Sequence, residues 1–204
     1  MSVQPDIEAI IADLDAVTRE AEILVSAYPH GVLEKAPTAG AWSAAQCLAH
    51  LAATNFQYLG VMRGAVQPAL HLHAHERSGP IRPGLPTRWF LANLEPPVRR
   101  RLRAHANTVP PSLAQIRAAW QEFQIAQAAV QDLLLECQHL DLNRIRFASP
   151  FAPILRFTVG AGFLIIAAHE RRHLWQAAQA VTATSSRTSR PVPQLPLLRI
   201  SDPV

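Results

Sequence analysis

The 204-residue sequence predicts an all-α protein, a four-helix bundle with a long crossed connection between its second and third helices. Three observations lead to this prediction. Four long segments repeat apolar residues at intervals of three and four, as amphipathic helices do. No segment reads convincingly as a strand. A long proline-rich stretch separates the second and third helical segments, which argues against a simple up-down order of helices.

The first helix is predicted from about Pro5 to Tyr28. Asp6 and Glu8 lie in its first turn, where the helix dipole favours acidic side chains, and the segment Tyr28-Pro29-His30-Gly31 ends it. The apolar residues of this segment form one stripe: Ile7, Ile10, Ile11, Leu14, Val17, Ala21 and Leu24.

The second helix is predicted to begin at Ser43 and to reach about Gly64. Ser43 is a suitable N-cap residue, and Gln46, three residues later, would complete a capping box. Trp42 precedes the cap, in the position of a hydrophobic staple.

Residues 65–111 interrupt the helical pattern. They contain eight prolines and few regular apolar repeats, so we expect an irregular connection with one short helix near Pro97–His105. Long connections in compact domains often form lids or pocket walls.

The third helix is predicted to start after Pro110-Pro111, with Ser112 as its cap, and to end near Gln138. A second connection covers 140–153, and the fourth helix is expected from about Ile154 to Val181. Ser, Thr, Arg and Pro dominate the sequence from Thr182 onward. We therefore expect one bundle domain over residues 1–181 and an extended or disordered tail over 182–204.

Composition excludes several functional classes. The net charge is +4, and the one dense basic cluster, Arg99-Arg100-Arg101 with Arg103, lacks the interleaved aromatic residues of nucleic-acid-binding segments, so no nucleic-acid partner is expected. The apolar run 157–168 is too short for a membrane span of about 20 residues. The two cysteines form no disulfide framework, and the N-terminal residues lack a signal-peptide pattern. These features predict a cytoplasmic protein, and a homodimer is compatible with a bundle of this kind.

The segment 169–173 reads His-Glu-Arg-Arg-His. Two histidines four positions apart lie on one face of a helix, a spacing at which both can bind one divalent metal ion. The best candidate for a third ligand is His50, which lies on the apolar side of the second helix. Gln176, three residues beyond His173, extends the same face and could orient a ligand or contact substrate.

The chain resembles the DinB-like metal-dependent proteins in two segments, 40–51 and 167–176. In that family a Trp-Ser pair opens the second helix, as Trp42-Ser43 would here, and a His-Leu pair follows, as His50-Leu51 does. The last helix of the family carries His-x-x-x-His, often followed by Gln, which corresponds to His169, His173 and Gln176. The resemblance covers roughly residues 5–181.

This resemblance implies that His50, His169 and His173 bind zinc, nickel or iron with open coordination positions. It also implies a thiol-dependent S-transferase or isomerase that uses bacillithiol, mycothiol or a similar low-molecular-weight thiol. Three neutral imidazoles leave the full charge of the dication, which would equally acidify a bound water for hydrolysis. We therefore expect a transferase or a hydrolase that acts on a small molecule.

Further residues are candidates for the site. Glu170 and Gln176 are the candidate catalytic residues, and Tyr58 and Arg172 are candidates for binding a thiol cosubstrate. Arg171 could share the role of Arg172, although a solvated helix face is the simpler explanation for both arginines. The expected pocket walls are Thr54, Tyr58, Trp120, Gln176 and the 65–111 connection.

Three alternatives remain open at this point. The pattern His169-Glu170-x-x-His173 matches zincin metalloproteases with Glu170 as general base, but a further zinc ligand after the motif and a sheet are missing from the sequence pattern. A non-catalytic small-molecule-binding or stress-related module would use the same residues. The alternating tract His71-Leu72-His73-Ala74-His75 could also bind metal, although a polar loop is the simpler interpretation.

Overall fold

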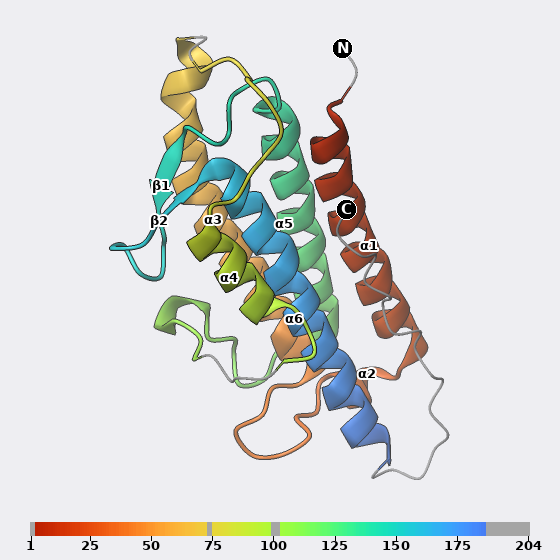
Figure 1. Ribbon diagram of the computed structural model, residues 1–204. Helices are drawn as coiled ribbons and strands as arrows, with labels where there is room; N and C mark the ends of the chain where they lie inside the picture. Colours follow the sequence, from red (N-terminus) through yellow and green to blue (C-terminus); the bar gives the residue numbers. More distant parts are fainter. Residues whose placement is uncertain (1–2, 73–74, 99–102, 187–204) are drawn as a thin grey trace.

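The computed structural model describes residues 3–72, 75–98 and 103–186. Four long helices run alongside one another (Figure 1): α1 (Pro5–Ala27), α3 (Ala44–His71), α5 (Ile116–Glu136) and α6 (Val159–Ser185). Helix α3 packs against α5 and α6, and α1 packs against the same two helices. The prediction of an all-α bundle is confirmed.

The apolar stripes of the four helices meet in two buried clusters. One surrounds Leu14, Met62, Val130 and Phe163, and the other surrounds Leu24, Leu48, Phe123 and Leu174. Of the stripe predicted for α1, Ile11 is partly buried and the other six residues are buried: Ile7, Ile10, Leu14, Val17, Ala21 and Leu24. A four-residue helix, α2 (His30–Leu33), follows α1 and places Leu33 in the second cluster.

The start of α3 has the predicted capping box. The Ser43 hydroxyl accepts a hydrogen bond from the Gln46 backbone N–H at 3.1 Å, and Gln46 Oε1 accepts one from the Ser43 N–H at 3.0 Å. The predicted end near Gly64 was too early, because α3 continues to His71 with Pro68 inside its last turn. The additional turns bury Val66 and Ala69, which the irregular spacing of apolar residues beyond Gly64 did not reveal.

The connection between α3 and α5 contains two short helices, α4 (Leu85–Leu94) and η1 (Ala106–Thr108). The short helix expected near 97–105 instead lies at 85–94, because Pro86 suits the first turn of a helix while Pro96-Pro97 follows its end. Residues 99–102, and with them most of the Arg99–Arg103 cluster, lie outside the described residues. Helix α4 packs across α6 (Figure 1), so the connection covers one side of the bundle.

Two further expectations need correction. Helix α5 begins at Ile116 with Gln115 as its N-cap, and Ser112 does not cap it. A hairpin of two short antiparallel strands, β1 (Arg146–Ala148) and β2 (Arg156–Thr158), precedes α6, which therefore starts at Val159 with Thr158 as its cap. Its other end continues to Ser185, so the first residues of the expected tail are helical. Residues 187–204 lie outside the described part of the chain.

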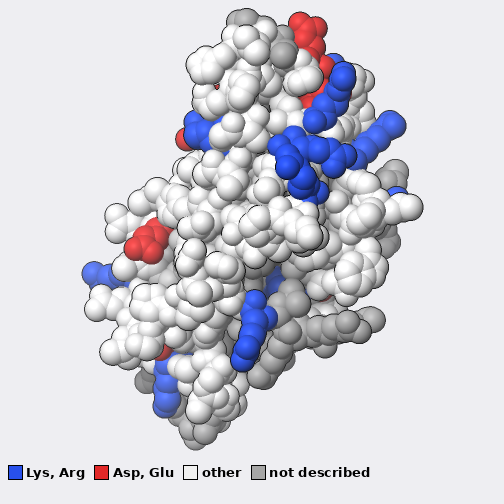
Figure 2. All heavy atoms as spheres, turned by 90° about the vertical axis from the view of Figure 1, so that its left-hand side faces the viewer, with Lys and Arg blue, Asp and Glu red and all other residues white. Residues whose placement is uncertain are grey.

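The hairpin carries a group of exposed positive charges. Arg144, Arg146 and Arg156 are all exposed on or beside the two strands. Figure 2 faces the hairpin side of the molecule and shows Lys and Arg side chains gathered in its upper part, while most of the remaining surface is uncharged.

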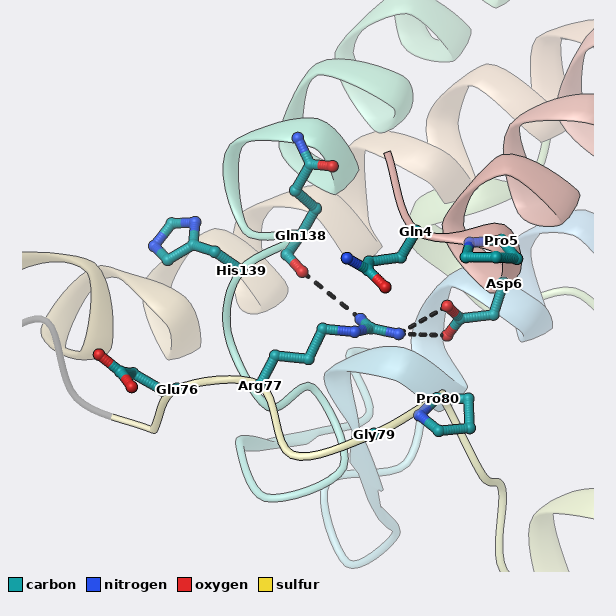
Figure 3. A pocket seen from close by; sticks show the side chains of 9 residues that line it. All are labelled: Gln4, Pro5, Asp6, Glu76, Arg77, Gly79, Pro80, Gln138 and His139. Atoms are coloured by element: carbon teal, nitrogen blue, oxygen red, sulfur yellow. Dashed lines mark hydrogen bonds and ion pairs between the residues drawn. The ribbon is translucent and has the colours of Figure 1, made fainter. Parts of the chain in front are cut away.

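An ion pair ties the loop after α3 to the start of α1. Arg77 donates from one guanidinium nitrogen to both carboxylate oxygens of Asp6 at 2.6 Å, and the Ile81 N–H donates to the same carboxylate at 2.8 Å. Figure 3 shows this pair at a cavity of about 670 Å³ beside Gln138 and His139. Burial opposes ionisation of Asp6, yet the bonds from Ile81 and Arg77 hold its pKa below the usual value. The cavity therefore encloses a structural contact between partners that already satisfy each other.

Among the described helices, none combines the length and apolar composition that a membrane span requires.

Candidate metal centre

Three histidines from two helices meet on the side of the bundle that the α3–α5 connection covers. His50 comes from the second turn of α3, and His169 and His173 come from successive turns of α6. One ring nitrogen of each lies within 4.8 Å of those of the other two. The ring centroids of His173 lie 4.5 Å from those of His50 and His169. The structure thus brings together the three residues that sequence spacing and resemblance singled out.

The backbone of η1 fixes the tautomer of His50. Its Nδ1 lies 2.7 Å from the carbonyl oxygen of Thr108. A carbonyl oxygen can only accept a hydrogen bond, so Nδ1 carries the proton and Nε2 keeps its lone pair. This is the arrangement in which protein metal sites orient their histidine ligands.

Trp42 packs over two of the three imidazoles. Its indole centroid lies 4.8 Å from that of His50 and 5.8 Å from that of His173, with the latter pair stacked at 30°. Because Ser43 caps α3 immediately afterwards, the cap sets the position of the indole over the histidines.

The environment keeps the three imidazoles neutral. Burial lowers the pKa of His50, and the Thr108 carbonyl only partly offsets this. Burial, with the charges of His50 and Arg172, lowers the pKa of His169 to about 3. Burial and the same neighbours, with His169, hold the pKa of His173 well below its ordinary value. Neutral imidazoles at neutral pH are the form that binds metal.

Two further buried nitrogen atoms are consistent with a metal site. Within the described part of the chain, Nδ1 of His169 and Nδ1 of His173 have no hydrogen-bond partner. A buried polar atom without a partner costs free energy, so such atoms point to a group that would satisfy them. Three imidazole nitrogens without a carboxylate form a donor set suited to zinc, nickel or iron, and so the residues present fit a divalent metal ion.

The histidines open into a cavity of about 1220 Å³ that runs along α6. Most of the predicted pocket residues line it, namely Thr54, Tyr58, Arg172 and Gln176. Arg172 is 4% exposed and donates to the Asn93 carbonyl at 3.2 Å. The hydroxyl of Tyr58 bonds Ser149, and burial raises the pKa of this tyrosine to about 12. The 65–111 connection supplies further walls, as expected: Phe90, Leu94, Val98, Arg103, Ala104, His105 and Thr108.

Glu170 lies on a different face of α6 from the histidines. It is fully buried between helices, does not line the cavity, and accepts a hydrogen bond from Asn55 Nδ2 at 2.7 Å. Burial raises its pKa to about 8 against the opposing bond from Asn55. This position, one residue and therefore about 100° around the helix from His169, gives the carboxyl no access to the histidine site.

Two other candidates, Trp120 and Arg171, also lie away from the cavity, and so does Cys47. Trp120 packs against the second core cluster, and Cys47 is fully buried within that cluster, where burial raises the pKa of its thiol to about 12. Arg171 binds Glu95 at 2.5 and 3.0 Å and Asp13 at 3.1 Å, so it links α6 to the connection and to α1. The tract His71–His75 contains residues 73 and 74, which lie outside the described part.

Sequence reasoning missed three features of the site. The Thr108 carbonyl left no signal, because every residue has a carbonyl. Phe151 lines the cavity from the hairpin loop, a segment without helical periodicity. The sequence indicated Trp42 only as a staple residue. Because Trp42 directly precedes the helix that carries His50, its position could also have suggested a role at the metal site.

Comparison with known proteins agrees with this arrangement. Searches of curated proteins and of solved structures found no match. A family model described as the DinB superfamily matches residues 13–177, most of the chain and all three histidines. The chain therefore belongs to the DinB superfamily.

Proposed function

We propose that this protein is a divalent-metal-dependent enzyme that acts on a small molecule, either as a thiol-dependent S-transferase or isomerase or as a hydrolase. The observation that carries this proposal is the convergence of His50, His169 and His173 at the wall of a large cavity. Structural metal sites are usually closed by four protein ligands, whereas three ligands beside a cavity leave a position for substrate.

A zinc, nickel or iron ion held by the three imidazoles would lower the pKa of a coordinating thiol or water and so supply a nucleophile near neutral pH. In the transferase reaction the sulfur lone pair forms a bond to an electrophilic carbon, the leaving group departs with its bonding pair, and the thiol proton passes to solvent. The neutral histidines add no negative charge of their own to offset the cation.

Other cavity residues supply binding and orientation. Arg172 places a guanidinium beside the histidines, where it can bind a carboxylate of a thiol cosubstrate. Gln176 lies beside His173 and offers an amide that can hold either the ring or a polar group of the substrate. Tyr58 contributes an aromatic wall, and its raised pKa keeps the phenol protonated, so that it does not serve as a base near neutral pH.

The position of Glu170 argues against a zincin-type metalloprotease. That mechanism needs the glutamate to reach a water at the metal, and Glu170 instead lies in the bundle interior on Asn55. One observation, the size of the cavity, favours a non-catalytic binding module instead. A cavity of this size could bind a small molecule without catalysing a reaction.

The metal content of histidine variants tests the site. His50→Ala, His169→Ala and His173→Ala should each abolish stoichiometric metal binding, measured by elemental analysis of protein purified without a histidine tag. His105→Ala is the matched control, because His105 lines the same cavity outside the three-histidine cluster. Full metal occupancy in the His50→Ala protein would remove that residue from the site.

A thermal-shift screen separates the enzyme classes. The metal-loaded protein is heated with bacillithiol, mycothiol, glutathione or cysteine, and a thiol at 100 times its dissociation constant should add about 2.7 kcal/mol of stability. A thiol that stabilises the loaded protein but not the His173→Ala variant supports the transferase. Uniform failure of the thiols, with metal-dependent hydrolysis of model esters, would favour the hydrolase instead.

A further inference from the structure

We propose that the small molecule acted on at the metal centre carries an apolar group the size of an aromatic ring, and that this group binds in one arm of the cavity. The arm is formed by five residues and is called the apolar arm here: Tyr58, Phe90, Leu94, Phe151 and Ile165. This inference rests on the proposed function for what happens to the small molecule at the metal. Binding of the apolar group in the arm does not depend on the metal.

The cavity extends to both sides of the histidines along α6. Its α6 lining runs from Ile165 to Ala183, which spans about 27 Å at 1.5 Å per residue. His169 lies one turn from the Ile165 end, so the cavity continues past the histidines for several turns in the other direction. A group that projects from the metal toward the N-terminal end of α6 therefore meets different walls from a group that projects the other way.

The walls of the apolar arm come from four separate parts of the fold. Tyr58 is on α3, Phe90 and Leu94 are on α4, Phe151 is in the hairpin loop, and Ile165 is on α6. The Tyr58 and Phe151 rings meet edge to face at a centroid distance of 5.5 Å. Leu94 and Ile165 are 3% and 1% exposed, although both line the cavity. The His105 ring lies 5.8 Å from that of Phe151 and adds one polar edge to walls that are otherwise mainly apolar. Walls of this kind favour an apolar or aromatic guest.

A polar group marks the point where the arm meets the histidines. Thr54 lines the cavity one turn after His50, is 3% exposed, and its hydroxyl has no hydrogen-bond partner among the described residues. A buried hydroxyl without a partner points to a ligand group that would bond it. The substrate thus needs a polar centre near the histidines and an apolar group beyond it.

The opposite arm offers amide and hydroxyl groups. Thr38, Gln176 and Gln179 line it, together with the aromatic rings of Trp42 and Trp175. The amide and hydroxyl groups suit the polar thiol, so the apolar partner belongs between α3, α4 and the hairpin loop.

The test compares two thiols that differ in their tails. Protein loaded with Co²⁺ is titrated with 2-phenylethanethiol and with 2-mercaptoethanol, and the thiolate-to-cobalt absorption band reports binding. We expect the phenyl compound to bind at least tenfold more tightly. Phe90→Ser, which makes the arm polar, and Ile165→Phe, which fills it, should each remove most of this preference. Phe56→Ser is the matched control, because Phe56 is 45% exposed on α3 and lies outside the cavity.

The outcomes separate the two proposals. If Co²⁺ binds and both thiols have equal affinity, the apolar arm is overturned and the metal centre stands. If Co²⁺ does not bind to the wild-type protein, the proposed function fails. Binding in the apolar arm is then tested on metal-free protein. Benzyl alcohol is titrated in, and NMR spectra of the methyl groups of Leu94 and Ile165 report whether it binds. Saturable shifts that Phe90→Ser abolishes support the arm, and shifts that are absent or unchanged in that variant overturn it.

Discussion

Trp42 packs against two of the three histidines. Its indole contacts the rings of His50 and His173, which come from different helices, and its own backbone precedes the Ser43 cap. A side chain that restricts ligand rings lowers the conformational entropy lost when metal binds, and outer residues of this kind typically contribute 10–100-fold in metal affinity.

We expect Trp42→Ala to weaken zinc binding by roughly 10–100-fold, while Trp42→Phe keeps most of the affinity because a ring still covers the imidazoles. Competition with a chelating dye measures the dissociation constants. Trp89→Ala is the control, since Trp89 is 68% exposed on α4 and does not line the cavity. Equal affinities for Trp42→Ala and the wild-type protein would contradict a role in positioning.

Glu170 makes the stability of the bundle depend on pH. Its pKa is raised from 4.5 in the unfolded chain to about 8 in the fold, chiefly by burial. Between these values the folded state keeps a proton that the unfolded state loses, so this group's contribution to the free energy of unfolding is full below pH 4.5 and falls as pH rises toward 8.

Glu170→Gln removes that dependence while its side-chain oxygen still accepts the bond from Asn55. For metal-free protein, the variant should gain stability over the wild type as pH rises from 5 to 8, on the order of a few kcal/mol at pH 8. Urea unfolding at several pH values measures the free energy of unfolding of both proteins. The histidines titrate in both, so their contribution cancels when one value is subtracted from the other. A difference that stays constant with pH would show that Glu170 is ionised in the folded state.

The sequence indicated the histidines because their spacing and the family resemblance both depend on local patterns. His169 and His173 are one helical turn apart whatever the tertiary structure. The pairing with His50 needed the family resemblance as well. Contacts through the backbone, such as the Thr108 carbonyl on His50, follow from the path of the connection and have no residue-type signal.

At the scale of elements, the contact between α3 and α6 depends on a glycine. A Cβ at Gly162 would lie 2.8 Å from Met62 Sδ and 2.9 Å from Phe147 Cε1, so a side chain there would push α6 away from α3 and from β1. Gly60 and Gly64, both on α3, have nothing within 4 Å of such an atom.

Gly162→Ala should therefore destabilise the protein by about 1 kcal/mol, since overpacking costs about 1–3 kcal/mol and the better helix propensity of alanine returns up to about 1. Gly60→Ala should instead stabilise it by about 0.5–1 kcal/mol, because only the propensity changes. Chemical denaturation measures both values. Stabilisation by Gly162→Ala would mean that α3 and α6 can separate without cost.

The elements that sequence predicted well were those that bury a continuous stripe. The α1 stripe and the Ser43 capping box are both present, because each depends on residues within a few positions. The β1–β2 hairpin and α4 were missed or misplaced, since three-residue strands and a ten-residue helix stay folded through contacts with distant helices rather than through local periodicity.

At the scale of the molecule, the largest buried side chains of the two core clusters lie away from the histidine cavity. Leu14, Met62, Phe123, Val130 and Phe163 are all at most 1% exposed, and none lines the histidine cavity. A site at the wall of such a bundle adds to its stability without being required for folding, unlike the metal sites of small zinc-dependent domains.

Removal of metal should therefore leave a folded protein that melts at a lower temperature. Metal present at 100 times its dissociation constant adds about 2.7 kcal/mol, which corresponds to roughly 5–11 °C for a chain of this size. Circular dichroism before and after chelation, with melting curves at several metal concentrations, measures both effects. The triple variant His50→Ala, His169→Ala, His173→Ala should keep its helical spectrum and lose the shift. Loss of helical signal on chelation of the wild-type protein would instead make the metal a structural component and would remove the argument for an open, substrate-binding site.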